Sequence, residues 1–396
     1  MFKLGRKTPQ TVKHSLIGLV FMLSFMFGFA QAITPAAPEL SAKSYIVMDF
    51  HSGKIIAEHN ADMPLPPASL TKMMTSYVVS AEIESGNLKL ADMVHISENA
   101  WAQNPLFKGS SLTWVEVNTE VSVEDLLKGV IIQSGNDASV ALAEHIAGSE
   151  DVFAKLMNQH AVRLGMLNTH FVNSNGLPAD GHTSTAKDLA ILAAAMIRDF
   201  PSEYKYYKEK WFTFNAIKQP NRNSLLWDES MKVDGIKTGH TDAAGYCLVS
   251  SAIKNSMRLV SVVMGTKSKR ARKNESKKLL AYGFRFFETV NPLQAGKKLH
   301  QQKIWMGDKE KISLGIAKDI YLTIPRGSAK KIKARYVVEK DIEAPINKGQ
   351  FIGKIFFTIN DKTIAEYPLV ALEEVKEAGF FGRMSDKVAR WFGSLF

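Results

Sequence analysis

The sequence predicts an α+β fold in which helices pack on an antiparallel sheet, followed by a small all-β domain and a terminal amphipathic helix. Three observations support this. Apolar residues recur with helical spacing in several segments between residues 69 and 199, and strand-like apolar runs flank that region. From about residue 291, short β-like pieces alternate with turn residues. At 396 residues with 45% hydrophobic side chains, the chain can hold two domains.

The N-terminal residues are typical of a secretory signal. A basic start leads into an apolar run at residues 16–29, and Ala30-Gln31-Ala32 supplies the small-x-small pattern that a signal peptidase cuts after. We therefore expect a signal peptide at residues 1–32 and a Pro/Ala linker at 33–42. Export without a disulfide favours a bacterial periplasm, because Cys247 is the only cysteine, and its apolar neighbours predict a buried side chain.

The composition argues against several classes of function. The formal net charge is +11, which is compatible with nucleic acid, an acidic polymer or an anionic membrane. Nucleic acid is not expected, because the sequence has no zinc-finger spacing, aromatic RNA motif or long basic tract. The ten histidines show no metal-ligand spacing, and no glycine-rich nucleotide loop is present, so neither a metal nor a cofactor is expected.

A catalytic domain is expected over residues 43–289. Two apolar runs around His51-Ser52-Gly53 predict a β-hairpin, and a helix is expected to start near Ser69 and end near Gly86. The remaining expected elements are a helical region at 123–148 interrupted at 133–137, helices at 150–165, 185–199 and 271–287, and strands at 246–253 and 258–265. The loop at 101–112 either packs its aromatic residues or lines a site.

Ser69 is the candidate nucleophile. Residues three apart share a helix face, so the Ser69 hydroxyl and the Lys72 amine can meet. A serine needs a base to remove its proton, and a lysine serves as that base when burial or another cation lowers its pKa. The spacing alone is weak evidence, because it recurs at Ser184/Lys187 and Ser202/Lys205, among others.

Two downstream motifs distinguish Ser69 from the other serines. Ser134-Gly135-Asn136 and Lys237-Thr238-Gly239 follow it in order, as in class A β-lactamases and penicillin-binding proteins. Ser134 is suited to relay a proton, and Asn136 to hydrogen-bond substrate amides or orient Lys72. Thr238 and its neighbours are expected at a strand edge that docks an extended peptide and its terminal carboxylate.

The C-terminal part is expected to be a small β domain at 290–377 and an amphipathic helix at 378–396. The β domain contains no catalytic constellation, so a spacer or an interaction module is expected. Aromatic and aliphatic residues of the tail fall on one helix face and basic residues on the other. We interpret the tail as a peripheral membrane anchor, the alternative being a helix packed on its own protein.

These motifs resemble the low-molecular-mass penicillin-binding proteins, specifically the D-alanyl-D-alanine carboxypeptidases of the penicillin-binding protein 5 and 6 type. The resemblance spans nearly the whole chain, including residues 67–77, 133–138 and 233–242, the β domain and the tail. It implies a penicilloyl-serine transferase (β-lactamase-like) catalytic domain. It also implies a location on the periplasmic face of the bacterial inner membrane, with anchoring by the C-terminal helix.

The resemblance also implies roles for individual residues. Ser69 would attack the D-Ala–D-Ala bond with Lys72 as proton acceptor. The backbone N–H groups of Ser69 and His240 would form the oxyanion hole, while Ser134 and Lys237 would pass the proton to departing D-alanine.

The implied substrate is the pentapeptide stem of peptidoglycan, and β-lactams that mimic it would acylate the same serine. Thr238, with Arg222 or Arg272, would bind the substrate carboxylate.

Three other readings remain open. A D,D-endopeptidase could use the same residues. A class A-like β-lactamase needs a deacylating glutamate, but Leu164 occupies that position ahead of Leu167-Asn168. A membrane-tethered wall scaffold with a vestigial site is disfavoured, because none of the motif residues has been lost.

Overall fold

A computed structural model describes residues 35–339 and 341–393. The expected signal peptide lies outside these residues. The larger sheet has the strand order β2-β1-β9-β8-β7, and each neighbouring pair is antiparallel. Its strands are β1 (Ser44–Asp49), β2 (Ile55–His59), β7 (Lys232–Thr241), β8 (Gly245–Lys254) and β9 (Met257–Thr266). The predicted hairpin and the two later strands are therefore confirmed.

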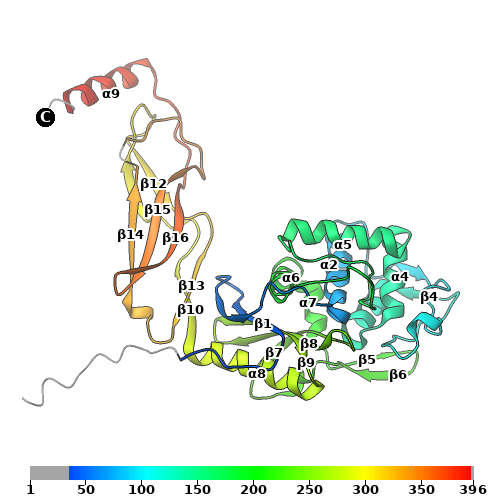
Figure 1. Cartoon of the computed structure of the whole chain (residues 1–396). Coiled ribbons are helices and arrows are strands. Elements are labelled where there is room, and N and C mark those ends of the chain that lie inside the picture. Colours follow the sequence, from blue (N-terminus) through cyan, green and yellow to red (C-terminus); the bar gives the residue numbers. More distant parts are fainter. Residues whose placement is uncertain (1–34, 340, 394–396) are drawn as a thin grey trace, which may run out of the picture. The chain divides into compact units, whose positions relative to one another are not determined.

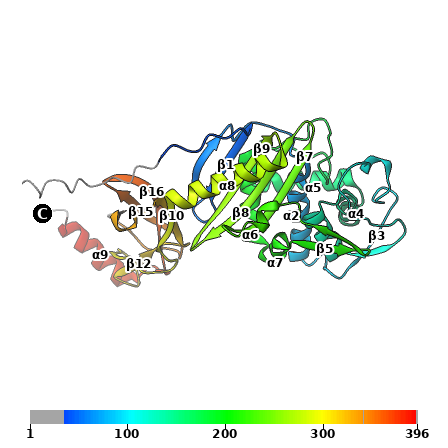
Figure 2. The same cartoon turned by 90° about the horizontal axis from the view of Figure 1, so that it is seen from below.

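Helices cover both faces of this sheet because its strands alternate their apolar side chains (Figures 1 and 2). Ile46 and Met48 point into the core shared with most of the helices, whereas Tyr45 and Val47 pack with the opposite helix, α8. The helices of the first face are α2 (Lys72–Glu84), α3 (Val123–Lys128), α4 (Asn136–Ala147), α5 (Glu150–Leu164), α6 (Ala186–Asp199) and α7 (Pro201–Tyr204). The other face is covered by α8 (Lys269–Phe286).

Several short elements complete this domain. Two small antiparallel sheets are formed by β3 (Met93–His95) with β4 (Glu120–Ser122), and by the hairpin of β5 (Trp211–Phe214) with β6 (Ile217–Pro220). A 3₁₀ turn, η1 (Ala68–Thr71), leads into α2, and a π-helical turn, η3 (Gly129–Gln133), follows α3. The expected interruption of the helical region near residue 133 is thus confirmed.

The C-terminal domain is all-β, as expected. Its five-stranded antiparallel sheet has the order β11-β12-β16-β15-β14, and β10 pairs separately with β13. The strands are β10 (Phe287–Leu293), β11 (His300–Lys303), β12 (Lys311–Gly315), β13 (Ile320–Pro325), β14 (Ile332–Val338), β15 (Phe351–Ile359) and β16 (Lys362–Ala371). The sequence predicts β-like pieces at 320–324, 335–338, 353–359 and 363–367, which lie in β13 to β16, and one at 303–305, which overlaps β11 only at Lys303. It does not predict β10 or β12.

The chain continues into α9 (Phe380–Gly393), the expected amphipathic helix. Its apolar side chains face solvent, with Phe381 86% and Phe380 64% exposed. Its polar face makes contacts instead: the Met306 backbone N–H donates to Asp386 (2.6 Å), and Arg390 pairs with Glu343. Within the described residues, no helix is long and apolar enough to cross a bilayer.

Candidate active site

Ser69 and Lys72 meet, as their spacing predicts. Ser69 lies half-buried in η1, and Lys72 begins α2 with its side chain fully buried. The Lys72 Nζ donates to Ser69 Oγ (3.4 Å), to Asn136 Oδ1 (2.6 Å) and to the Asn175 carbonyl (2.5 Å). These three oxygens hold the amine next to the serine hydroxyl.

The surroundings of Lys72 favour its neutral form. Burial, with a smaller contribution from the nearby charge of Arg222, lowers the pKa of Lys72 to about 7. Asp137 and Glu150 oppose this shift through their negative charges. A substantial fraction of the amine is therefore unprotonated near neutral pH, and such an amine can accept a proton from a hydroxyl.

Ser134 is presented by a strained turn. It follows the π-helical turn η3 and has a left-handed backbone conformation (φ 65°, ψ 35°), which costs a non-glycine residue about 1–2 kcal/mol. Such strain is often concentrated at functional sites. Gly135 comes next, where a Cβ would lie 2.0 Å from Thr113 Oγ1, so a larger residue would collide with that neighbouring loop.

Asp137 fixes the loop that approaches this turn. Its fully buried carboxylate accepts hydrogen bonds from the backbone N–H groups of Thr113, Trp114 and Val115 at 2.7–3.2 Å. Burial raises the pKa of Asp137, while these N–H donors act in the opposite direction. Gly109, Ser110 and Ser111, which precede these donors in the same loop, line the cavity described below.

Lys237 pairs with Ser134 across the site. β7 is an edge strand, and Lys237 Nζ donates to Ser134 Oγ at 2.8 Å. Lys237 is only 3% exposed, and burial holds its pKa well below the usual value. Nearby cations, Lys72 first among them, add to that shift. The predicted strand edge is confirmed. At Gly239 a Cβ would lie 2.9 Å from the Pro67 carbonyl, so the chain before η1 packs closely against β7.

These groups surround a polar cavity of about 210 Å³. Predicted site residues that line it are Ser69, Ser134, Asn136, Arg222, Thr238, His240 and Arg272. Lys72 and Lys237 are buried beneath its surface, as their low exposure shows. The 101–112 loop has both expected functions, because Phe107 packs in the core while Gly109 and its neighbours line the cavity.

The two candidate arginines bond to main-chain oxygens. Arg222 Nε donates to the Gln133 carbonyl (3.1 Å), and Arg272 donates to the Gly239 carbonyl (3.0 Å). These carbonyls are neutral, and within the described residues no carboxylate pairs with either guanidinium. The positive charge of both arginines therefore favours binding of an anion such as a carboxylate in the cavity. His240 stacks on Tyr246 with ring centroids 3.9 Å apart.

Sequence reasoning missed the loop at 171–184. Its Asn175 carbonyl contacts Lys72, and its Ser174 carbonyl accepts from Thr75 (2.5 Å). Glu150 in turn accepts from the backbone N–H of Ser174 (2.9 Å) and from the Asn175 amide (3.0 Å). The cluster Asn173-Ser-Asn-Gly176 is typical of a turn, but nothing in it indicated contact with Lys72.

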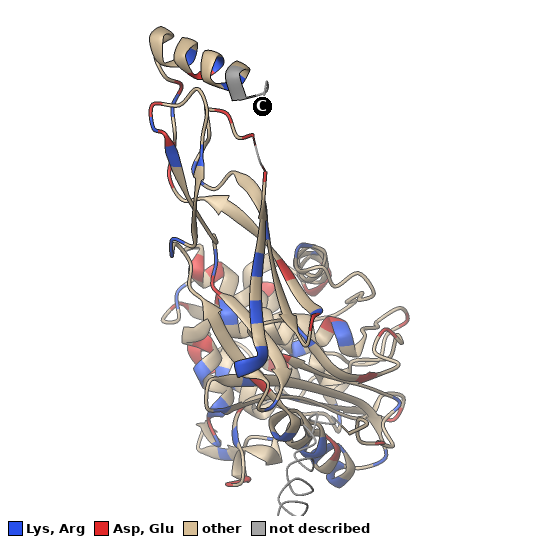
Figure 3. Cartoon of the chain, turned by 90° about the vertical axis from the view of Figure 1, so that its left-hand side faces the viewer, with Lys and Arg blue, Asp and Glu red and all other residues tan. Residues whose placement is uncertain are grey.

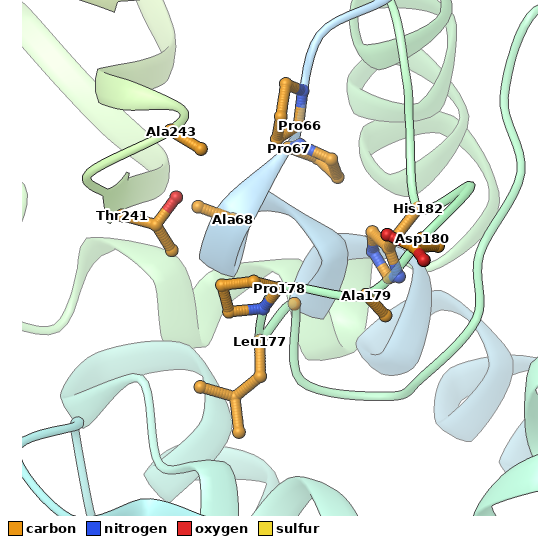
Figure 4. A pocket seen from close by; sticks show the side chains of 11 residues that line it. Pro66, Pro67, Ala68, Leu177, Pro178, Ala179, Asp180, His182, Thr241 and Ala243 are labelled. Atoms are coloured by element: carbon orange, nitrogen blue, oxygen red, sulfur yellow. The ribbon is translucent and has the colours of Figure 1, made fainter.

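A second cavity, of about 250 Å³, adjoins the first, because Gly176, Leu177 and Thr241 line both. Figure 4 shows the side chains that line the second cavity. Its walls are mainly apolar, and His182 lies at one side. The His182 Nδ1 accepts from the Val172 backbone N–H (3.0 Å), which leaves Nε2 to donate to Thr71 Oγ1 (2.7 Å). Burial lowers the pKa of His182 to about 4, so at neutral pH it is an uncharged link between this loop and η1. No nucleophile–base pair lines this cavity, so we assign the chemistry to the first one.

Within the described residues, no cluster of histidine, cysteine and carboxylate side chains is suited to hold a metal ion. Cys247 is fully buried, and burial raises the pKa of its thiol to about 11. The cysteine is therefore the small core residue that its neighbours predicted.

Comparisons with known proteins agree with the geometry. Residues 31–268 match the family described as D-alanyl-D-alanine carboxypeptidase, and residues 287–377 match the penicillin-binding protein 5 C-terminal domain. The chain is 52% identical over 369 residues to D-alanyl-D-alanine carboxypeptidase DacA of Escherichia coli (strain K12), covering 92% of each.

Solved structures extend this likeness. Penicillin-binding protein 5 from Haemophilus influenzae superposes with a TM-score of 0.84 at 48% identity, covering 87% of this chain and 100% of that one. Penicillin-binding protein D2 from Listeria monocytogenes, solved in its ampicillin-bound form, has a TM-score of 0.55 at 30% identity. The superposition covers 63% of this chain and 100% of the Listeria protein.

Proposed function

The chain belongs to the D-alanyl-D-alanine carboxypeptidase family and is a serine D-Ala-D-Ala carboxypeptidase of the penicillin-binding protein 5 type, in which we propose that Ser69 is the nucleophile and Lys72 its base. The observation that carries this proposal is the position of the Lys72 amine, 3.4 Å from Ser69 Oγ and with a pKa lowered to about 7. A buried neutral amine at that distance is suited to remove the serine proton.

The proposed acylation proceeds as follows. Ser69 Oγ attacks the carbonyl carbon of the penultimate D-alanine, and its proton passes to Lys72. The backbone N–H groups of Ser69 and His240 stabilise the oxyanion. When the C–N bond breaks, Ser134 delivers a proton to the departing D-alanine. The 2.8 Å contact between Ser134 Oγ and Lys237 Nζ supports this relay, because the lysine can return a proton to the serine hydroxyl.

Substrate binding is assigned to the remaining residues that line the cavity. Thr238 donates to the terminal carboxylate, and Arg222 or Arg272 supplies the positive charge, which is supported by their neutral main-chain partners. Asn136 holds Lys72 and binds the substrate amide. Water then hydrolyses the acyl-enzyme. A β-lactam would acylate Ser69 in the same way, and the ampicillin-bound relative supports this.

We further propose that the substrate is the peptidoglycan pentapeptide and that the enzyme acts at the periplasmic face of the inner membrane. The proposed organisation is a signal peptide at 1–32, a linker at 33–42, a catalytic domain at 43–289, a β domain at 290–377 and an anchor at 378–396. The outward-facing Phe380 and Phe381 support peripheral anchoring, because burying such side chains in a lipid interface is favourable.

The decisive experiment measures D-alanine released from a peptide ending in D-Ala–D-Ala, with and without penicillin. We expect release by the wild type, none by Ser69→Ala, and normal release by Ser202→Ala. Ser202 is a matched control because it begins an exposed Ser-x-x-Lys. Equal release by Ser69→Ala would contradict the assignment of the nucleophile. Cleavage of cross-linked muropeptides in place of D-alanine release would favour the endopeptidase reading.

The anchor has its own test, which is cell fractionation. We expect Phe380→Glu/Phe381→Glu to move the active enzyme from the membrane to the soluble periplasm. Lys387→Glu should change the distribution little by comparison, because it leaves the apolar face intact. Membrane retention of the double variant would contradict the proposed anchor.

A further inference from the structure

β14 (Ile332–Val338) has a free edge. It is the last strand of the C-terminal sheet and pairs along its whole length with β15, from Ile332 opposite Ile359 to Val338 opposite Gly353. Among the residues that the structure describes, no strand pairs with its other side. Five consecutive residues at its centre are exposed. An edge of this kind leaves backbone N–H and C=O groups available to a further strand.

One face of β14 is basic. Side chains alternate along a strand, so Lys333 and Arg335 share a face, and Lys331 precedes them in the same phase. Figure 3 shows this row as blue bands along β14. The Arg335 guanidinium lies over the Phe356 ring at 4.8 Å, which fixes its position. The Lys333 side chain is 74% exposed, and its ion pair with Asp361 at 3.6 Å is too exposed to neutralise the charge of Lys333 effectively.

The opposite face of β14 is apolar and adjoins a cavity of about 330 Å³. Ile332 and Ala334 line this cavity together with Leu293 of β10 and Phe357 of β15. Tyr336 continues the same face, 42% exposed, with its ring 4.9 Å from that of His300. Apolar side chains beside an open strand edge favour occupation of the cavity by apolar side chains of another segment.

We propose that β14 is a docking edge for an extended segment of a partner protein in which acidic and apolar side chains alternate. As an added strand, that segment would place its acidic residues opposite Lys333 and Arg335. Its apolar residues would then point toward the cavity and Tyr336. Because side chains on β14 alternate between a basic and an apolar face, the partner segment must alternate acidic and apolar residues to match both faces. The main chains of the two strands would supply the hydrogen bonds.

Lysines on edge strands also protect proteins against aggregation. That role explains the basic face but not the apolar one, because a protective edge gains nothing from an open apolar cavity and an exposed tyrosine. The two faces together carry the inference.

Fluorescence anisotropy with short labelled peptides tests the proposal on the purified full chain. A peptide of alternating Glu and Val should bind saturably, and more weakly as salt increases. A peptide of the same composition ordered Glu-Glu-Val-Val should bind much less, because both residue types fall on both faces. Equal binding of the two peptides would overturn the proposal, since charge alone would then suffice.

Two variants locate the site. Lys333→Glu/Arg335→Glu should weaken binding about tenfold or more and favour a Lys/Val peptide. Ala334→Trp should weaken binding by filling the cavity while leaving the charge unchanged. Lys311→Glu/Lys348→Glu is the matched control, because it makes the same change in charge away from β14. An unchanged urea-unfolding midpoint checks that the β domain of each variant is folded, and unchanged carboxypeptidase activity checks the catalytic domain.

Besides equal binding of the two peptides, three further results would overturn the inference. They are no binding of the alternating peptide, equal weakening by the control variant, and a concentration-dependent dimer in sedimentation that is lost in Lys333→Glu/Arg335→Glu. The last result would mean that a second copy of the chain occupies the edge.

Discussion

The two five-stranded sheets carry charge in opposite ways. Lys237 on β7 is 3% exposed and contacts Ser134, whereas Lys354 on β15 has a side chain that is 50% exposed and pairs with Glu366. Both lysines lie on strands of antiparallel sheets, but only Lys237 is buried, and that burial moves its pKa well below the usual value. Burial among other cations favours the neutral, reactive form of a lysine amine, whereas water stabilises the charge of a lysine on the surface.

The largest expected effect comes from Lys72, the buried lysine next to the proposed nucleophile. Lys72→Ala should slow acylation by penicillin about a thousandfold, because it removes the proposed base. Stopped-flow measurement of acyl-enzyme formation tests this. Lys187→Ala is the control, since Lys187 belongs to a Ser-x-x-Lys whose lysine only pairs with Asp62 at the surface. Comparable rates for the two variants would place the base elsewhere.

The next effect concerns a buried carboxylate in the same region. Asp137→Asn replaces one acceptor oxygen by an amide, so backbone N–H groups of residues 113–115 lose a partner. We expect the free energy of unfolding to fall by roughly 2–4 kcal/mol, as measured by urea denaturation. Asp151→Asn, at an exposed position in the first turn of α5, should cost less than about 1 kcal/mol. Equal costs would mean that burial of Asp137 adds nothing.

The lowered pKa of Lys72 also predicts how the rate of acylation depends on pH. Because the Lys72 pKa is lowered to about 7, the neutral amine is the minority form below that pH and the major form above it. The acylation rate should therefore rise about tenfold per pH unit below 7 and level off above it. Arg222→Gln removes a charge that lowers this pKa, so its profile should shift to higher pH. A flat profile between pH 5 and 9 would contradict the assignment.

Local patterns were enough to predict the motif residues but not their connections. Ser69 and Lys72 meet because of helical spacing alone, and the order of the three motifs indicated Ser134 and Lys237. The left-handed turn at Ser134 depends on tertiary packing, which short-range patterns do not encode. The same holds for the contact of Asn175 with Lys72, which joins residues 103 apart.

The fold shows the same limit. Long periodic helices and the two apolar strands β8 and β9 were predicted to within a few residues. β10 was missed because Asn291 and Pro292 lie within it and are poor strand formers. β12 was missed because it is short and ends at Gly315. Pairing with neighbouring strands overrides these weak local preferences.

The smallest expected effect lies in the C-terminal sheet. Lys354 Nζ is 3.1 Å from Glu366 Oε1, and Lys354 sits opposite Pro368, so the ion pair is a diagonal one across β15 and β16. Both side chains are about half exposed, and water therefore screens their attraction. A double-mutant cycle with Lys354→Ala and Glu366→Ala should give a coupling of about 0.5 kcal/mol or less in unfolding, decreasing with salt. A coupling several times larger would mean that this sheet, too, gains stability from its charges, and the contrast with β7 would fail.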